Sequence, residues 1–124
     1  MRAVNDFAGQ LGVRTVRADS ESSELTFDAG GDHLNPAGTV HGGVLATLVD
    51  SAMGAVARHV SGDGEVPATS QLTVTYLNPA RTGPMVVTGR MRKRGKHLMV
   101  CDADVEQDGQ PVVHAVATFG VVQR

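Results

Sequence analysis

The chain has 124 residues, of which 41% are hydrophobic and 19% charged, and its formal net charge is −2. This length fits a single domain over residues 1–124, since either half would be too small to bury an adequate core, and the composition is not that of a disordered chain. The near-neutral charge excludes a global basic field that would attract nucleic acid or an anionic membrane.

The N-terminal residues lack the continuous apolar core of a signal peptide, and no apolar run approaches the roughly 20 residues that span a bilayer. The single cysteine, Cys101, rules out an internal disulfide and is compatible with a reducing cytosol. We therefore expect a cytoplasmic protein.

In chain order, the elements are two strands, one long helix and four further strands. A weak helical pattern over residues 1–11 precedes two alternating runs, 12–19 and 22–29, which are typical of a hairpin, and a loop rich in Gly, Asn and Pro follows. The one long helical segment covers 41–60. The later strand-like runs are 67–78, 85–93, 97–107 and 111–122. Because these four strands follow one another with no crossover helix, the sequence predicts antiparallel pairing in an α+β fold.

The predicted helix carries an acidic residue on an unusual face. On a helical wheel one broad arc is apolar and the opposite arc is built mainly from small residues, with Asp50 the only ionisable residue between His41 and Arg58. Small residues let another backbone or a ligand come close, and a carboxylate there would be costly unless it is paired or used in chemistry. The wheel alone is equally compatible with an Asp50 that simply points to water.

The same helix starts with two glycines. The N–H groups of Gly42 and Gly43 stand where no intrahelical partner exists and where the helix dipole is positive, which suits a developing oxyanion; two glycines also simply permit a tight turn into a helix. Gly42 and Asp50 are separated by about 12 Å along one helix, too far to act on the same carbonyl group. If both act together, two antiparallel copies of the helix must share the site, which predicts an oligomer.

Other candidate residues carry weaker signals. The five histidines lack metal-ligand spacing, no serine lies in a Gly-x-Ser-x-Gly pattern, and Cys101 in its apolar strand is interpreted as inert core. Basic residues gather at Arg90, Arg92, Lys93, Arg94 and Lys96. They fit either a solvated hairpin whose charges discourage aggregation or a binding place for phosphate groups, and Arg81 is a further phosphate candidate.

Several segments resemble one known family. Residues 35–43 (NPAGTVHGG), with Asp50 seven residues after the second glycine, resemble the phenylacetate-pathway type of hot-dog thioesterase; residues 71–80 (QLTVTYLNPA) and the turn 94–96 are similar to later segments of it. The resemblance runs from about residue 30 to 120. It implies a hot-dog fold, an antiparallel sheet of five to six strands wrapped around one long central helix. It also implies homodimers joined edge to edge and often paired into homotetramers.

The resemblance further implies a reaction, the hydrolysis of an acyl-CoA thioester with an aromatic or medium-chain acyl group, without metal or organic cofactor. Carried over by position, Asp50 would be the general base or the nucleophile, and the Gly42 N–H would polarise the thioester carbonyl. His41 and Asn35 would shape or polarise the site, and Thr69 would help to orient water. Gly54 stands where several relatives carry Ser or Thr, so a polar role is absent there. The expected substrate-binding residues are Gly43, Arg81, Arg92, Arg94 and Lys96.

Two other functions remain open. One is a non-catalytic module that binds or senses acyl-CoA on the same fold; the carboxylate at position 50 and the lack of a DNA-binding extension argue against it. The other is a hydratase or dehydratase relative, which would require a His and Asp pair at a different spacing in the helix region. That pair is missing here.

Overall fold

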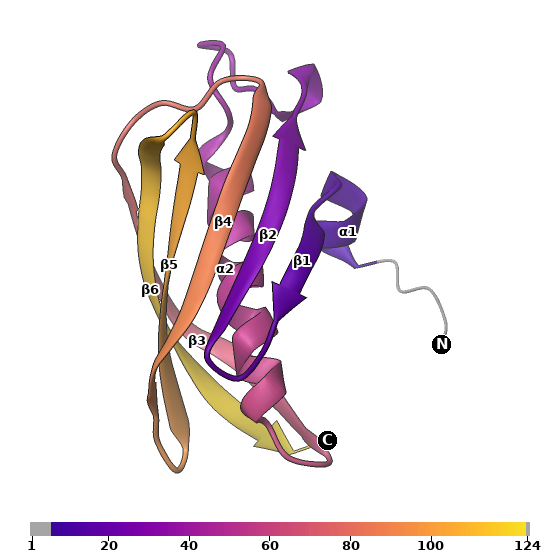
Figure 1. The fold of residues 1–124 in the computed structure, drawn as a ribbon, viewed down its shortest axis with the longest axis vertical. Helices are drawn as coiled ribbons and strands as arrows, with labels where there is room; N and C mark the ends of the chain where they lie inside the picture. Colours follow the sequence, from indigo (N-terminus) through magenta and orange to yellow (C-terminus); the bar gives the residue numbers. More distant parts are fainter. Residues whose placement is uncertain (1–5, 124) are drawn as a thin grey trace.

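A computed structural model describes residues 6–123 as one six-stranded sheet that curves around one long helix (Figure 1). The elements are α1 (Phe7–Leu11), β1 (Arg14–Ala18), β2 (Ser22–Ala29), the short 3-10 helix η1 (Gly31–His33), α2 (Gly42–Val60), β3 (Glu65–Tyr76), β4 (Gly83–Arg94), β5 (Leu98–Gln107) and β6 (Gln110–Gln123). The predicted hairpin, long helix and four following strands are confirmed, with ends displaced by at most two residues. The first five residues of the expected N-terminal helix lie outside the described residues.

The strands are ordered β1-β2-β4-β5-β6-β3, and every neighbouring pair is antiparallel, as the short connections predict. The chain leaves β2, runs through α2 beneath the sheet, and returns as β3 along the far edge beside β6 (Figure 1). Among residues 6–123, the strand β3 therefore pairs only with β6, and its other edge meets no further strand. Between β5 and β6, Asp108 and Gly109 both take positive φ values, 53° and 76°, as the predicted tight hairpin turn requires.

The helix α2 fills the concave face of the sheet. Its residues Leu48, Val49, Ala52, Met53 and Val56 are fully buried against aliphatic side chains that alternate along the strands. The contact is closest at Gly89 of β4, where a Cβ would come 2.6 Å from the Ala52 carbonyl oxygen. The same oxygen accepts a hydrogen bond of 2.7 Å from the buried Ser23 hydroxyl. The absence of a side chain at residue 89 thus sets how deeply the helix sits in the sheet.

The opposite side of α2 is less covered by the chain. Gly43 is exposed, and Thr47, Asp50 and Ser51 are half-buried. Gly54, expected on the same small face, is buried instead. Within residues 6–123, none of the helices combines the length and the apolar character needed to cross a bilayer.

Candidate active site

The first turn of α2 has one backbone donor without a protein partner. The His41 ring caps the helix by accepting the Gly43 N–H at its Nδ1 (2.9 Å), and the N–H groups of Val44 and Leu45 both reach the His41 carbonyl oxygen (3.0 and 3.3 Å). Among the described residues, no acceptor meets the Gly42 N–H. At the positive end of the helix dipole, Gly42 is thus the donor left for a ligand. The Gly43 N–H is already bonded to the His41 ring, so Gly43 has no free N–H to offer a ligand.

The cap also fixes the state of the His41 ring. A nitrogen that accepts the Gly43 N–H carries no proton, so the neutral ring holds its proton on Nε2. His41 therefore shapes the site by holding a backbone group.

A cavity of about 390 Å³ lies beside Gly42, between the loop before α2 and the segment after β3. Its size falls in the range of ligand pockets, and apolar side chains make up much of its wall. The lining residues are Asn35, Thr39, Val40, Gly42, Gly43, Leu45, Tyr76, Leu77, Asn78, Pro79 and Ala80.

Asn35 forms one wall of this cavity by folding the loop on itself. Its Oδ1 accepts the N–H groups of Ala37 (3.0 Å) and Thr39 (3.2 Å), and its Nδ2 lies 3.0 Å from the Thr39 hydroxyl. The loop is then tied to the segment after β3, because the Val40 N–H donates to the Ala80 carbonyl (2.9 Å). The side-chain contacts of Asn35 thus lie inside the loop and hold its shape beside the cavity.

Asp50 lies two turns further along α2 and meets Thr69 of β3. The Thr69 hydroxyl donates to Asp50 Oδ1 at 2.7 Å. A β-bulge between Thr69 and Gln71 interrupts the pairing with β6 at this point. Bulges commonly re-aim side chains beside functional sites. The structure thus brings Asp50 and Thr69 together, and places Gly42 and Asn35 in the wall of a cavity that neither Asp50 nor His41 lines.

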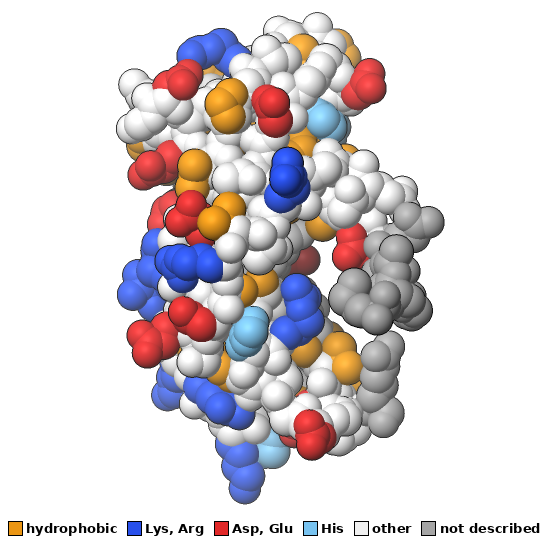
Figure 2. All heavy atoms as spheres, turned by 45° about the vertical axis from the view of Figure 1, so that its right-hand side comes forward, with side chains coloured by type: hydrophobic (Ala, Val, Ile, Leu, Met, Phe, Trp, Pro, Cys, Tyr) orange, Lys and Arg blue, Asp and Glu red, His pale blue; other side chains and the backbone are white. Residues whose placement is uncertain are grey.

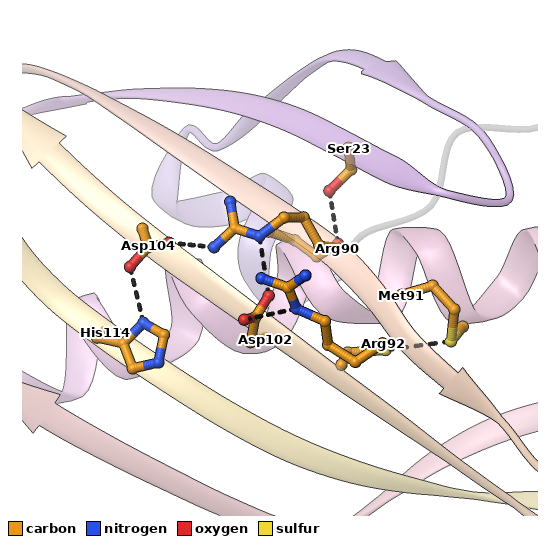
Figure 3. A network of polar contacts seen from close by, with 9 residues as sticks. Ser23, Arg90, Met91, Arg92, Asp102, Asp104 and His114 are labelled. Atoms are coloured by element: carbon orange, nitrogen blue, oxygen red, sulfur yellow. Dashed lines mark hydrogen bonds and ion pairs between the residues drawn. The ribbon is translucent and has the colours of Figure 1, made fainter.

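The predicted phosphate-binding cations divide into two kinds. Arg90 and Arg92 belong to an ionic network on the outer face of the sheet (Figure 3), in which both contact Asp102 at 2.9 Å and Arg90 also pairs with Asp104. His114 completes the network with its Nδ1 2.7 Å from Asp104. Arg92 is therefore already paired with an acid. By contrast Lys93, Arg94 and Lys96, in or beside the β4–β5 turn, make no ion pair among the described residues.

The pKa values of Asp104 and Arg90 are both shifted in the direction that favours their ion pair. Partial burial opposes the charge on Asp104, but the hydrogen bond from His114 and the Arg90 guanidinium outweigh it and lower the pKa of Asp104. Burial likewise opposes the charge on Arg90, yet Asp104 and Asp102 raise its pKa. Figure 2 shows the resulting surface, on which basic side chains along one side are interleaved with acidic ones.

Arg81 lies at the other end of the molecule from the β4–β5 turn. It follows Ala80 at the cavity and forms an exposed ion pair with Asp108 at 3.6 Å. Its backbone is held firmly, because the buried Gln107 amide accepts the Arg81 N–H (2.9 Å) and donates to the Arg81 carbonyl (2.7 Å). The β4–β5 turn lies at the opposite end of the sheet, beside the C-terminal end of α2 (Figure 1). Arg81 and Arg94 of one chain therefore do not meet the same phosphate group.

Two residues of the site were not singled out from the sequence. Gln107 is one, and Tyr76 is the other: its hydroxyl donates to the Gly42 carbonyl oxygen at 2.8 Å. The available signal for Tyr76 was its position as the chain's one tyrosine, at the end of a strand and before Leu-Asn-Pro.

Two further features of the sequence were Cys101 and the scattered histidines. Cys101 is fully buried, and this burial, with Asp102 nearby, raises the pKa of its thiol to about 11, so the prediction of an inert core cysteine is confirmed. Across residues 6–123, no three His, Cys, Asp or Glu side chains gather as a metal site would require.

Residues 37–114 match the profile of the thioesterase superfamily. The chain belongs to this family, and its architecture is the hot-dog fold that the resemblance implied. A phenylacetic acid degradation-related protein from Ralstonia eutropha JMP134 is 30% identical, with a TM-score of 0.90 over 98% of this chain and 92% of that one. A Streptococcus mutans UA159 protein, solved bound to acetyl-CoA, is 25% identical, with a TM-score of 0.83 over 100% of this chain and 94% of that one.

Acyl-coenzyme A thioesterase 13 from Mus musculus is 36% identical over 94 residues, which is 75% of this chain and 66% of the mouse protein. The human protein of the same name matches over 53% of its length. The chain thus spans between about half and two thirds of these curated relatives.

Proposed function

We propose that this chain hydrolyses acyl-CoA thioesters to the free acid and CoA. The observation that carries the proposal is the first turn of α2, where the Gly42 N–H is the one donor left without a protein partner and borders a cavity of about 390 Å³. The family supports this reaction, and two relatives support the substrate class: the mouse protein by its name, and the Streptococcus mutans protein by its bound acetyl-CoA.

In the proposed mechanism, the Gly42 N–H donates a hydrogen bond to the thioester oxygen. This bond strengthens as negative charge develops on the oxygen, and the α2 dipole adds to it. Asp50 either takes a proton from the attacking water or attacks the carbonyl carbon itself. Thr69 holds Oδ1 of Asp50, which leaves Oδ2 for the reaction. On the general-base route, the C–S bond breaks as Asp50 passes the water proton to the sulfur, which gives the free acid and the CoA thiol. On the nucleophilic route, the C–S bond breaks to leave the acyl group on Asp50 as an anhydride, and the CoA thiolate takes a proton from water. A water molecule then hydrolyses the anhydride to the free acid and restores the carboxylate.

The proposed site is shared by two chains. Because Gly42 and Asp50 are about 12 Å apart on one helix, a second copy with its α2 antiparallel must supply the carboxylate. The open edge of β3 supports such a dimer, since Tyr76 and Leu77 at its end are 52% and 48% exposed beside the cavity. We propose a homodimer that pairs further into a homotetramer, with residues 1–124 as one domain and the cytoplasm as its location.

An antiparallel dimer also gives the basic residues a common role. The connection from β3 to β4, which contains Arg81, lies at the end of the molecule where α2 begins, whereas the β4–β5 turn, which follows Arg94 and contains Lys96, lies at the end where α2 finishes (Figure 1). In an antiparallel pair, the turn of one chain approaches the Arg81 end of its partner. The CoA phosphates would then meet cations from both chains, and Arg92, already paired with Asp102, would contribute less.

The test is a steady-state assay with a panel of aromatic and medium-chain acyl-CoAs. We expect Asp50→Ala and Asp50→Asn to lower kcat by about 10²–10⁴, the range for loss of a general base or nucleophile. Asp63→Asn, which removes an exposed acid from the turn after α2, is the matched control and should retain full activity. If Asp50→Ala keeps the wild-type kcat, the mechanism is wrong.

The same assay separates this function from a binding module. A wild-type protein that binds acyl-CoA but turns over none of the panel would support non-catalytic binding or sensing. Light scattering tests the shared site independently, and a stable, active monomer would contradict it.

A further inference from the structure

We infer that Tyr76 is a positioning residue of this site, whose hydroxyl holds the Gly42–Gly43 peptide so that the Gly42 N–H points at the thioester oxygen. The inference rests on the proposed function. Tyr76 is the last residue of β3, and its hydroxyl donates to the Gly42 carbonyl oxygen at 2.8 Å. Its side chain also lines the cavity beside Gly42.

The peptide unit between the two glycines is held at both of its polar groups. Tyr76 binds its carbonyl oxygen, and His41 Nδ1 accepts its N–H at 2.9 Å. Glycine has the freest backbone of all residues, and the first turn of a helix lacks part of the hydrogen-bond ladder. The free Gly42 N–H belongs to the preceding peptide, whose His41 carbonyl accepts the N–H groups of Val44 and Leu45. The two peptides meet at the Gly42 Cα, where glycine turns most freely. By holding the second peptide, Tyr76 and His41 limit this rotation and so keep the Gly42 N–H directed at the ligand.

The contact between Tyr76 and Gly42 also depends on the glycine. A Cβ at residue 42 would lie 3.1 Å from the Tyr76 hydroxyl oxygen and 3.2 Å from the ring carbon that carries it. The ring thus packs directly on the Gly42 backbone. Because the side chain is about half exposed, burial of the ring is not its main contribution. Its hydroxyl group is what distinguishes it from a simple apolar wall.

A β-bulge explains how one strand reaches both parts of the site. Thr69 and Tyr76 are seven residues apart, so in a regular strand their side chains would point to opposite faces. The register with β6 shifts between Thr69 and Gln71, which adds one residue and restores the alternation. Thr69 then lies opposite the buried Phe119, and Tyr76 opposite the buried Val113, on the face that meets α2. The strand β3 therefore supports Asp50 with one hydroxyl and Gly42 with another.

The test compares Tyr76→Phe with Thr75→Ala, which changes the exposed neighbour on the outer face of the same strand. Tyr76→Phe keeps the ring and removes only the donor. We expect kcat to fall about tenfold, with KM within about twofold of wild type, because a misdirected N–H weakens the transition state more than the bound substrate. Thr75→Ala should match wild type in both constants.

A second measurement separates positioning from general destabilisation. The probe is an acyl-CoA analogue with a methylene inserted between sulfur and a ¹³C-labelled carbonyl, which the enzyme binds but does not hydrolyse. A hydrogen bond to the oxygen moves the carbonyl resonance downfield. We expect this shift in the wild type and in Thr75→Ala, and a clear reduction in Tyr76→Phe at equal occupancy.

The outcomes are distinct. A Tyr76→Phe variant with wild-type kcat and a wild-type carbonyl shift overturns the role of Tyr76 and leaves the thioesterase proposal standing. A wild type that hydrolyses no acyl-CoA refutes the proposed function, while the carbonyl shift still decides whether Tyr76 directs the Gly42 N–H.

Discussion

Replacing Gly42 with proline removes the proposed oxyanion donor while changing little else. Proline is favoured at the first position of a helix, which Gly42 occupies, because the N–H there has no intrahelical partner. His41 has φ −58° and ψ 134°, a conformation that a residue before proline adopts readily. Since no described acceptor meets the Gly42 N–H, the substitution breaks no internal hydrogen bond.

Gly42→Ala is the matched control. It introduces the same Cβ, 3.1 Å from the Tyr76 hydroxyl oxygen, but keeps the N–H. Loss of one oxyanion-hole donor typically lowers kcat by about 10²–10³, or about 2.7–4 kcal/mol, and we expect this difference between the two variants. Their free energies of unfolding should agree within about 1 kcal/mol, because both variants add a Cβ against the Tyr76 ring and proline is well accepted at the first helical position.

The assay is the initial rate of CoA release at saturating acyl-CoA, followed with a thiol reagent. The protein contributes little background, because its one cysteine is buried and the pKa of the thiol is about 11. Equal kcat values for Gly42→Pro and Gly42→Ala would refute the assignment of the N–H as the oxyanion donor.

Three further predictions concern the groups around this site and the sheet beneath it. Thr69→Val removes the donor to Asp50, and kcat should fall about tenfold, because the carboxylate loses the hydrogen bond that holds it in place. Gly89→Ala places a Cβ 2.6 Å from a carbonyl oxygen of α2 and should lower the free energy of unfolding in urea by about 1–3 kcal/mol, whereas Gly120→Ala, which meets nothing within 4 Å, should not. Asp104 has a lowered pKa in the folded protein, so its stabilising contribution is present above the ordinary value of 3.8 and is lost as the pH falls through the lower folded value. The difference in free energy of unfolding between wild type and Asp104→Asn should therefore disappear below that pH. A difference that does not change with pH would contradict a stabilising ion pair at Asp104.

Local sequence patterns were sufficient to predict the elements and their antiparallel pairing, whereas the wrapping of the sheet around the helix came from the family resemblance. The apolar periodicity of residues 41–60 predicted α2, and alternation together with short turns predicted the antiparallel strands, because both signals arise from neighbouring residues. Asp50 stood out for the same reason, as the one charge on a face of small residues. The choice of Thr69, as a hydroxyl that orients water, came from the family resemblance, and the structure places this hydroxyl in contact with Asp50.

The rest depended on contacts between distant residues. Tyr76 and Gly42 are 34 residues apart, and the bulge after Thr69 decides which face of β3 Tyr76 occupies, which alternation alone predicts incorrectly. The ion pair of Arg92 with Asp102 depends on the register of two strands. The residue pattern within one strand does not specify its register with a neighbouring strand. Arg92 was therefore grouped with Arg94 and Lys96 as a phosphate-binding candidate.

The central claim, a site built from Gly42 of one chain and Asp50 of another, is tested most directly by mixing two inactive variants. Gly42→Pro and Asp50→Asn subunits are co-expressed with different tags, and the mixed dimer is purified. In that dimer one site carries both substitutions and the other carries neither, so the account predicts about half of the wild-type kcat per dimer. A mixed dimer no more active than its two parents would contradict a site shared between chains.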